Sequence, residues 1–388
     1  YTGTFGGSLW VLIVNIFIYK ALQTIIKGYS PKFILRDWLL PICLIVVPMA
    51  VSYLIYYTYD EKSAPINVVS VQPNLDPYEE QYELPAEDVI NRAVSLALQK
   101  TDSTTDFIIF PESMIQPDFS SGMMIWENDL SNHPTFTMFR SKLLKRFPES
   151  RVISGYSTYR SYGKGEEITT TARKFRNGDG YYDAYNTAIL ISGTPELQLS
   201  HKSRLTPGVE MMPFPWLLKP LGGFAIDLGG TVGALGVDKE QIPFRINDTL
   251  SIAPIICYES AYGEFVNRFI KNGANAIFII TNDGWWGNSP GHRQHMLFST
   301  IRSIETRRSI ARSANTGISC FVNQRGNISS RTDYWVPVSI KGTINGNDKI
   351  TFYVRYGDYI ARGSVLGAVL LLLVVLVQHF KPEISKRD

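Results

Sequence analysis

The stretch Ser251-Ile-Ala-Pro-Ile-Ile-Cys-Tyr-Glu-Ser260 decides the fold, because an apolar run ends there at a cysteine and a polar turn. A short apolar run bounded by polar residues is typical of a buried strand. The run Phe107–Phe110 has the same character, since Pro111-Glu112-Ser113 follows it at once. We therefore expect Cys257 and Glu112 at the ends of two buried strands. Each also has a plainer interpretation, as a small buried thiol and as a solvated carboxylate in a turn.

Strand-like and helical segments alternate outward from these two runs, across residues 62 to 357. Helical periodicity covers Glu87–Lys100 and His292–Ser313, and a helix is expected at Glu259–Asn272. The polar segment Tyr156–Tyr182, rich in Gly and Tyr, is interpreted as a surface loop or hairpin. Further strand-like runs are Ile66–Val71, Val152–Ser154, Ala188–Ser192 and Ala276–Thr281. The alternation predicts an α/β fold packed around sheets.

Long apolar stretches flank this region. Trp38–Tyr57 is twenty residues without a charge, which is enough to cross a hydrocarbon core of ~30 Å. Gly363–Phe380 is a second such stretch, with its helix expected to start near Tyr359. Leu9–Tyr19, extended by the apolar residues before it, is either a third crossing or a buried core helix. We predict three membrane-spanning helices.

Basic residues near these stretches predict the orientation. Lys20, Lys27, Lys32 and Arg36 lie between the first two spans, and Lys381, Lys386 and Arg387 follow the last one. Positive residues favour the cytoplasmic side, so the sequence predicts a multi-pass protein with its globular region on the outer side. The expected domains are two transmembrane helices with a short cytoplasmic loop (1–57), a catalytic domain (58–358), and a final helix with a cytoplasmic tail (359–388). Because the chain opens at Tyr1 rather than Met, we expect it to be a fragment or a trimmed product.

Composition excludes several classes of protein. Charged residues make up 19% of the 388 residues, below the ~25% typical of soluble domains, and 45% are hydrophobic, which excludes a disordered chain. A net charge of +3 without a long basic block gives no support for nucleic-acid binding. Cys43, Cys257 and Cys320 are too few and too scattered for a disulfide framework or a zinc site.

A third polar segment completes a set of candidate residues. In His201-Lys-Ser-Arg-Leu-Thr-Pro-Gly-Val-Glu210, Lys202 precedes a Pro-Gly turn. Such a lysine is commonly just solvated. Together, however, Phe-Pro-Glu112, His-Lys202 and Ile-Cys257-Tyr-Glu resemble the Glu-Lys-Cys triads of the nitrilase superfamily, in the same order along the chain. The resemblance implies a nitrilase-like αββα sandwich with the triad at the strand ends.

The flanking spans narrow the resemblance to the bacterial apolipoprotein N-acyltransferases. Thr281-Asn-Asp-Gly-Trp-Trp-Gly287, Gln294-His295 and Tyr185-Asn186-Thr187 are similar to motifs of that family, as are Arg302, Glu305, Arg308 and Asn315-Thr-Gly317. The family's Pro-Phe-Gly-Glu is here Pro207-Gly-Val-Glu210, which keeps the glutamate eight positions after the lysine. Tyr78 stands where the family has a tryptophan in the loop after the first strand.

The residue types fit acyl transfer through a thioester. Cys257 is expected to be the nucleophile and Glu112 the general base. Lys202 would stabilise the oxyanion and keep the pKa of the cysteine low. The resemblance adds Glu210 and Glu259 as supporting carboxylates, and Tyr258, Asn186, Trp285 and Tyr78 as supporting or substrate-binding residues. Glu259 has a plainer interpretation as a first-turn acid of the helix Glu259–Asn272.

The resemblance also implies the partners and the location. A membrane phospholipid would donate the acyl chain, and the acceptor would be the α-amino group of the diacylglyceryl-cysteine of an apolipoprotein. The protein is expected to be a monomer in the bacterial inner membrane, with its catalytic domain on the periplasmic side. No cofactor or metal is expected, and His292 and His295 are interpreted as structural because they lack carboxylate or Cys partners.

Two other functions remain open at this point. One is a membrane-anchored nitrilase-type amidase that hydrolyses a small amide with the same triad. The other is an inactive membrane scaffold, against which the presence of all three triad residue types argues.

Two further expectations concern the lysine and the segment after it. Because Lys202 lies in a loop, its replacement by methionine is expected to change stability little. The apolar stretch 211–230 is interpreted either as an arm that dips into the membrane, with Trp216 at the interface, or as a buried connection.

Overall fold

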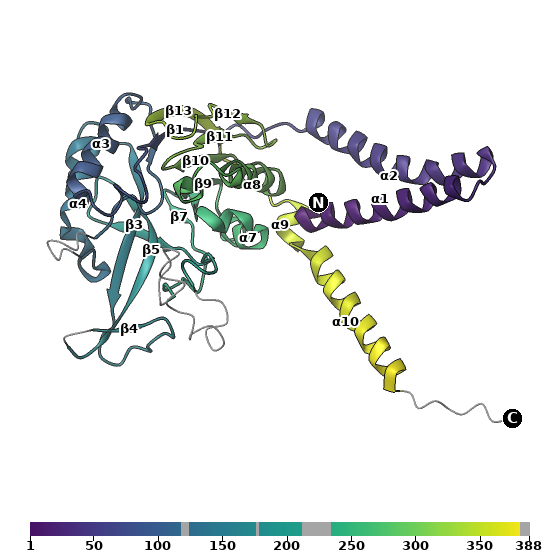
Figure 1. The fold of residues 1–388 in the computed structure, drawn as a ribbon. Coiled ribbons are helices and arrows are strands. Elements are labelled where there is room, and N and C mark those ends of the chain that lie inside the picture. The colour runs from purple at the N-terminus through teal and green to yellow at the C-terminus, as the bar shows by residue number, and fades with distance from the viewer. Residues whose placement is uncertain (118–123, 176–177, 212–233, 381–388) are drawn as a thin grey trace. The chain divides into compact units, whose positions relative to one another are not determined.

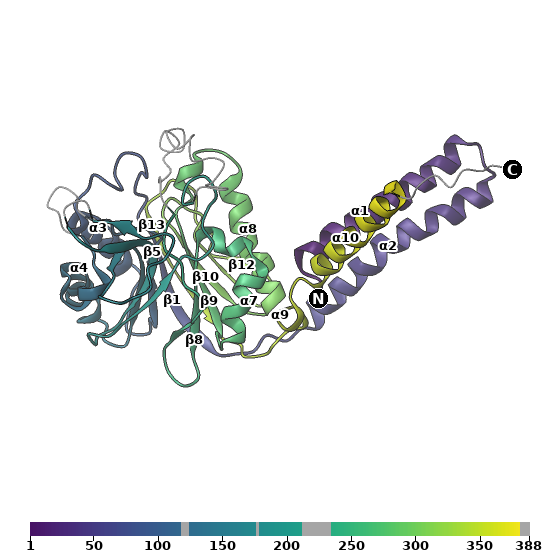
Figure 2. The ribbon, with the colours of Figure 1, turned by 90° about the horizontal axis from the view of Figure 1, so that it is seen from below.

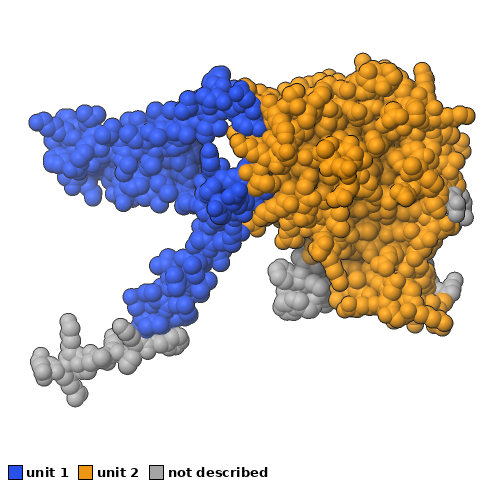
Figure 3. Space-filling view, turned by 180° about the vertical axis from the view of Figure 1, so that it is seen from behind, with its two compact units in different colours: residues 1–60, 351–388 blue, residues 61–350 orange. Residues whose placement is uncertain are grey.

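The computed structural model describes residues 1–117, 124–175, 178–211 and 234–380. The chain forms two compact units: residues 1–60 with 351–388, and residues 61–350 (Figure 3). Residues 212–230, which include most of the predicted membrane-dipping arm, lie outside the described residues.

The first unit is helical. It contains α1 (Gly3–Ile26), α2 (Pro31–Thr58), the short α9 (Phe352–Tyr356) and α10 (Tyr359–Phe380). Among the described residues, α1, α2 and α10 are long and apolar enough to cross a membrane. α1 leaves most of its apolar side chains exposed, with Leu12 at 62%, as a lipid-facing helix would and a buried core helix would not. The indole of Trp10 in α1 donates to the carbonyl oxygen of Leu44 in α2 at 2.7 Å.

The second unit is a sandwich of two mixed β-sheets. The first sheet has the order β13-β1-β2-β3-β5-β4, with β6 paired to β5; the second has the order β12-β11-β10-β9-β8-β7. The first sheet contains β1 (Pro65–Gln72), β2 (Phe107–Ile109), β3 (Arg151–Ser161), β4 (Arg173–Lys174), β5 (Tyr181–Ile191), β6 (Leu197–His201) and β13 (Val338–Asn345). The second contains β7 (Phe244–Arg245), β8 (Ser251–Ile256), β9 (Ala276–Thr281), β10 (Ile310–Ala314), β11 (Cys320–Val322) and β12 (Ile328–Ser329).

Helices cover the outer faces of both sheets (Figures 1 and 2). α3 (Ala86–Leu98) and α4 (Pro134–Phe139) lie on the side of the first sheet, and α7 (Gly263–Lys271) and α8 (Gly291–Thr306) on the side of the second. The layers therefore run helix, sheet, sheet, helix. This confirms the predicted αββα sandwich with long apolar helices at both ends of the chain.

The alternation of side chains along β2 explains why two cores form. Phe107 and Ile109 point to the second sheet, and the ring of Phe107 meets that of Phe278 edge-on at 5.0 Å. Ile108 and Phe110 point the other way, into the core under α3 and α4. Burying each such side chain stabilises the fold by roughly 1.5–3 kcal/mol. A strand buried on both faces must be apolar throughout, which is why these runs show no alternation with polar residues.

Two predicted helices are shorter than the sequence indicates. α8 ends at Thr306, and Arg307 adopts a left-handed conformation with φ 54°. The next residues form β10, which pairs in parallel with β9 and is buried on both faces. The predicted helix Glu259–Asn272 is divided into a 3-10 turn, Cys257–Ala261, and α7. Tertiary pairing overrides the helical periodicity in the first case.

The segment Tyr156–Tyr182 is mainly a hairpin extension. β3 and β5 continue their antiparallel ladder out to the pair Ser161–Tyr182. β4 adds to β5 at this end. Each of the two strands has 11 residues and is therefore more than twice as long as its apolar run.

Candidate active site

The predicted acid and lysine meet in the interior of the sandwich. Glu112 follows the end of β2, and Lys202 follows the end of β6. The Nζ atom of Lys202 lies 2.8 Å from Oε1 of Glu112, and their side chains are only 2% and 5% exposed. Lys202 is therefore a buried, paired cation rather than a solvated loop residue.

Close backbone contact with β3 fixes the position of Glu112. The N–H of Gly155 donates to the carbonyl oxygen of Pro111 at 3.0 Å, and the N–H of Ile115 donates to the carbonyl oxygen of Gly155 at 3.1 Å. A Cβ atom on Gly155 would lie 2.6 Å from the Cα atom of Glu112. Glycine is required here because the two backbones touch.

Three further groups hold the carboxylate and the lysine. Asn186, on β5, donates from Nδ2 to Oε1 of Glu112 at 2.8 Å, and the backbone N–H of Asn282 donates to Oε2 at 3.0 Å. Glu210 places Oε1 2.7 Å from Nζ of Lys202. Burial alone would lower the pKa of Lys202, but Glu112, Cys257 and Glu210 outweigh it, and the pKa lies well above its usual value. The ammonium group is therefore charged at neutral pH.

Cys257 lies where β8 turns into the 3-10 turn. Its φ of 51° is unusual for a residue with a side chain. Burial raises the pKa of its thiol, and so does the charge of Glu112, while Lys202 lowers it. The contribution of Lys202 thus has the expected direction, but burial and the charge of Glu112 outweigh it, and the pKa of the thiol lies above its usual value.

Glu259 ties the lysine loop to the cysteine strand. Its Oε1 accepts a hydrogen bond from the N–H of Ser203 at 2.6 Å, and its Oε2 accepts one from the N–H of Ile256 at 2.8 Å. The second bond is that of a first-turn acid, as the plainer interpretation predicts, although it belongs to the 3-10 turn. Burial raises the pKa of this carboxyl to about 8.

Aromatic side chains lie beside these polar groups. Tyr78 and Trp285 are exposed and pack edge to face with their centroids 5.1 Å apart. Tyr82, which the sequence reasoning missed, lies 6.3 Å from Trp285. Partial loss of solvent, with the charges of Glu112 and Glu210, raises the pKa of Tyr82 to about 12, so Tyr82 adjoins the carboxylates. Tyr258 is half-buried and packs edge-on against Tyr262 at 5.2 Å.

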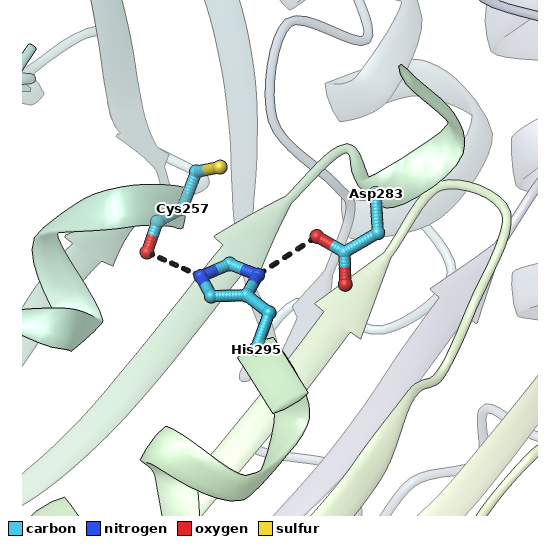
Figure 4. A group of neighbouring side chains, drawn as sticks. All are labelled: Cys257, Asp283 and His295. Carbon is cyan, nitrogen blue, oxygen red and sulfur yellow. Dashed lines mark hydrogen bonds and ion pairs between the residues drawn. The ribbon is translucent and has the colours of Figure 1, made fainter. Parts of the chain in front are cut away.

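The two histidines differ from each other. The ring of His292 stacks on Tyr334 at 3.9 Å, as a structural residue would. His295 has a carboxylate partner, which corrects the expectation from the sequence: its Nδ1 lies 2.9 Å from Oδ1 of Asp283, and its Nε2 lies 3.0 Å from the carbonyl oxygen of Cys257 (Figure 4). The partner was missed because Asp283 and His295 come from different elements.

Cys257, Asp283 and His295 place one potential ligand atom each within 4.8 Å of one another. Both ring nitrogens of His295 already face hydrogen-bond partners. Asp283 is paired with the guanidinium of Arg312 at 2.5 Å, which would repel a second cation. The donor set therefore fits a hydrogen-bonded network better than a metal ion.

Comparisons with known proteins identify the family. The profile of the carbon-nitrogen hydrolase family matches residues 68–345, so the chain belongs to that family. Nit3 of Saccharomyces cerevisiae, a member of branch 10 of the nitrilase superfamily, has a similar fold, with a TM-score of 0.50 and 15% identity over 72% of this chain and 90% of that one.

Within the family, the relatives that match along nearly the whole chain are apolipoprotein N-acyltransferases. The chain is 28% identical to the one from Chlorobaculum tepidum, over 97% of this chain and 69% of the relative. It is 23% identical to the one from Geobacter metallireducens, over 95% of this chain and 65% of the relative. The chain thus spans about two thirds of the length of these relatives, and the resemblance seen in its motifs is confirmed.

Proposed function

We propose that the protein transfers a fatty acyl chain from a membrane phospholipid to the α-amino group of the N-terminal diacylglyceryl-cysteine of apolipoproteins. The observation that carries the proposal is the buried Lys202 between Glu112 and Glu210 beside Cys257, in a chain whose described part contains three helices apolar enough to cross a membrane. Homology to apolipoprotein N-acyltransferases supports the choice of substrates.

The first half of the reaction acylates the cysteine. Glu112 takes the proton from the thiol, and the thiolate attacks the ester carbonyl carbon of the phospholipid. The oxyanion that forms is stabilised by the ammonium group of Lys202. The backbone N–H of Tyr258 is a second donor, since N–H groups in the first turn of a helix lack intrahelical partners. The tetrahedral intermediate collapses, the glycerol oxygen takes the proton back from Glu112, and a lysophospholipid leaves.

The second half transfers the acyl group to the amine. The neutral α-amino group attacks the thioester carbonyl, and the same donors stabilise the new oxyanion. Glu112 accepts a proton from the attacking nitrogen and returns it to the departing thiolate of Cys257. The products are the N-acylated cysteine and the free thiol. Lys202 keeps its charge throughout, which its raised pKa permits.

The remaining parts of the proposal concern organisation and location. Residues 1–57 form two transmembrane helices, residues 58–358 the catalytic domain, and residues 359–388 the last transmembrane helix with its tail. The catalytic domain faces the periplasm of a bacterial inner membrane, in agreement with the basic residues of the short loops, and the protein acts as a monomer without a cofactor. Tyr78 and Trp285 contact the lipid substrates: both rings are exposed, and Trp285 lies 6.3 Å from Tyr82, whose pKa the charges of Glu112 and Glu210 help to raise.

The test is intact-protein mass spectrometry of the purified protein in detergent micelles with phospholipid. We expect an adduct of one fatty acyl group on Cys257, and its loss when a diacylglyceryl lipopeptide with a free N-terminus is added. The lipopeptide should gain the same acyl mass. Failure to form the adduct would refute the proposal. Hydrolysis of small amides without acyl transfer would favour the membrane-anchored amidase.

A further inference from the structure

A buried polar network lies behind the cysteine, on the side of its carbonyl group. His295 extends from α8 to the end of β8, and Figure 4 shows its ring meeting the carbonyl oxygen of Cys257 rather than the sulfur. The hydroxyl of Ser260 donates to the same carbonyl oxygen at 2.8 Å. His295 and Ser260 are both buried. One carbonyl oxygen is thus held by two side chains that the proposed chemistry does not use.

The other edge of the histidine ring is fixed by charged groups. Oδ1 of Asp283 lies 2.9 Å from Nδ1 and also accepts a hydrogen bond from the hydroxyl of Thr281 at 2.7 Å. Oδ2 of Asp283 lies 2.5 Å from Nη2 of Arg312, a fully buried residue of β10. Burial alone would raise the pKa of Asp283, but Arg312 and His295 lower it to about 2. The ring is therefore held against a permanent carboxylate.

The geometry indicates which way the hydrogen bond to Cys257 runs. A ring with protons on both nitrogens donates from Nε2 to the carbonyl oxygen. The tautomer with its proton on Nε2 also donates there, and its unprotonated Nδ1 lies 3.2 Å from Nη2 of Arg312 but also faces Oδ1 of Asp283 at 2.9 Å. The remaining tautomer turns the lone pair of Nε2 to the carbonyl oxygen at 3.0 Å, where two acceptors repel, and Ser260, whose hydroxyl is also 3.0 Å from Nε2, would then donate to the ring instead of to the carbonyl. We take Nε2 and the hydroxyl of Ser260 both to donate to the carbonyl oxygen of Cys257.

The carbonyl of Cys257 belongs to the same peptide group as the N–H of Tyr258. A trans peptide group is planar, so its C=O and N–H bonds point in opposite directions. Fixing the carbonyl oxygen against His295 and Ser260 thereby fixes the direction of the N–H on the other side. Cys257 itself has the unusual φ of 51°, a conformation that costs of order 1–3 kcal/mol unless its surroundings support it.

We propose that His295 is a positioning residue for the acyl-transfer reaction: it orients the Cys257–Tyr258 peptide group so that the N–H of Tyr258 acts together with Lys202 on the oxyanion. Asp283 and Arg312 hold the ring in place for this role. The inference rests on the proposed function, because it assigns a purpose to the peptide group only if a tetrahedral oxyanion forms at Cys257.

Two substitutions of similar size separate this role from simple core packing. The amide nitrogen of glutamine lies near the position of Nε2, so His295→Gln keeps a donor to the carbonyl of Cys257. The amide nitrogen of asparagine lies near the position of Nδ1, so His295→Asn keeps the contact to Asp283 and loses the donor. His292→Gln, one turn earlier on α8, is the matched control, since His292 stacks on Tyr334 instead.

The assay measures acylation of the purified protein by a phospholipid in micelles and by p-nitrophenyl butyrate, an activated ester that needs no lipid recognition. We expect His295→Asn to lower kcat for both acyl donors at least tenfold, part of the ~10²–10³ that loss of a whole oxyanion donor costs. KM should stay unchanged, and His295→Gln should recover most of the rate. Alkylation of Cys257 by iodoacetamide forms no oxyanion, so its rate in the His295 variants should differ from that of the wild-type protein by less than threefold.

Several results would overturn the inference. One is an equal loss of kcat for acylation in His295→Asn and His295→Gln. Another is a loss of kcat below threefold in His295→Asn. The third is a rate of alkylation that falls as much as the rate of acylation. If His295→Asn does not fold, Ser260→Ala tests the same carbonyl, and it should lower acylation by roughly three- to tenfold. Acylation of the wild-type protein by the nitrophenyl ester but not by phospholipid would refute the proposed function alone. Acylation by neither donor would refute both.

Discussion

Replacing Lys202 with methionine removes the ammonium group that lies between two carboxylates in the interior of the sandwich. Nζ is 2.8 Å from Glu112 and 2.7 Å from Glu210, and the lysine side chain is 2% exposed. Removing one partner of a buried ion pair typically costs 3–5 kcal/mol, because it leaves a charge without compensation. Here two carboxylates are left, so we expect a loss of about 3–5 kcal/mol in the free energy of unfolding. This reverses the expectation from the sequence.

Thermal unfolding in detergent, followed by circular dichroism, measures this effect. At about 2–4 °C per kcal/mol for a domain of this size, Lys202→Met should lower Tm by roughly 6–20 °C. The triple variant that also carries Glu112→Gln and Glu210→Gln has no buried charge in this cluster and should recover at least half of the loss. Acyl-enzyme formation should be lost in both.

An exposed ion pair of the same length provides the control. Nη2 of Arg160 lies 2.8 Å from Oε2 of Glu166, with the side chains 45% and 43% exposed. Exposed pairs contribute ~0–1 kcal/mol, so Arg160→Met should shift Tm by at most about 2–4 °C. If Lys202→Met lowers Tm by no more than Arg160→Met does, other groups compensate the two buried carboxylates. The expectation of a large loss of stability from burial would then be wrong.

Three other predictions concern the nucleophile, a neighbouring histidine and the aromatic rings. Cys257→Ala should abolish the acyl adduct seen by mass spectrometry, whereas Cys320→Ala, in β11, should keep it; an adduct on the first variant would disprove the assignment. His201 donates to Asp238 and Glu127, which outweigh burial and raise its pKa to about 9 from 6.5. Its contribution to stability, about 3 kcal/mol at 1.36 kcal/mol per pKa unit, is therefore fully present below pH ~6.5 and is lost as pH rises through ~9. Urea unfolding at pH 6 and pH 10 measures the difference in the free energy of unfolding between the two pH values. This difference should be smaller in His201→Gln, and an unchanged difference would refute the coupling of stability to His201. Trp285→Ala should raise KM for phospholipid severalfold with kcat nearly unchanged, and the opposite pattern in steady-state kinetics would place the ring at the reacting atoms instead.

The ends of the buried strands could be predicted from local sequence. Phe107–Phe110 and Ser251–Ile256 are apolar without interruption, and each is followed at once by polar residues. A strand between two layers has this composition because both of its faces are buried. Burial on both faces therefore makes the places of Glu112 and Cys257, at the ends of these strands, predictable from the sequence.

The end of α8, which the sequence places at Ser313 and the structure at Thr306, depends on distant parts of the chain. So does the network around His295. Ile310–Ala314 continues the periodicity of α8, and its pairing with β9 and β11 makes it a strand. Asp283, His295 and Arg312 come from a 3-10 turn, a helix and a strand, so no spacing along the sequence links them. The same applies to the burial of Lys202, since a lysine next to a Pro-Gly turn has the local signature of an exposed residue.

The contact between Gly155 and Glu112 makes the β3–β5 hairpin a mechanical part of the active site. β3 is hydrogen-bonded to the segment that carries Glu112, and β5 carries Asn186, which binds the same carboxylate. With backbone against backbone, there is no side chain between them to change rotamer and absorb a displacement. The other oxygen of Glu112 accepts from the N–H of Asn282, which follows β9 in the opposite sheet. Glu112 therefore joins the hairpin to the sheet that carries Cys257, and a substitution far out on the hairpin, near Tyr182, is expected to reach the proposed base through the backbone and not through a change of rotamer.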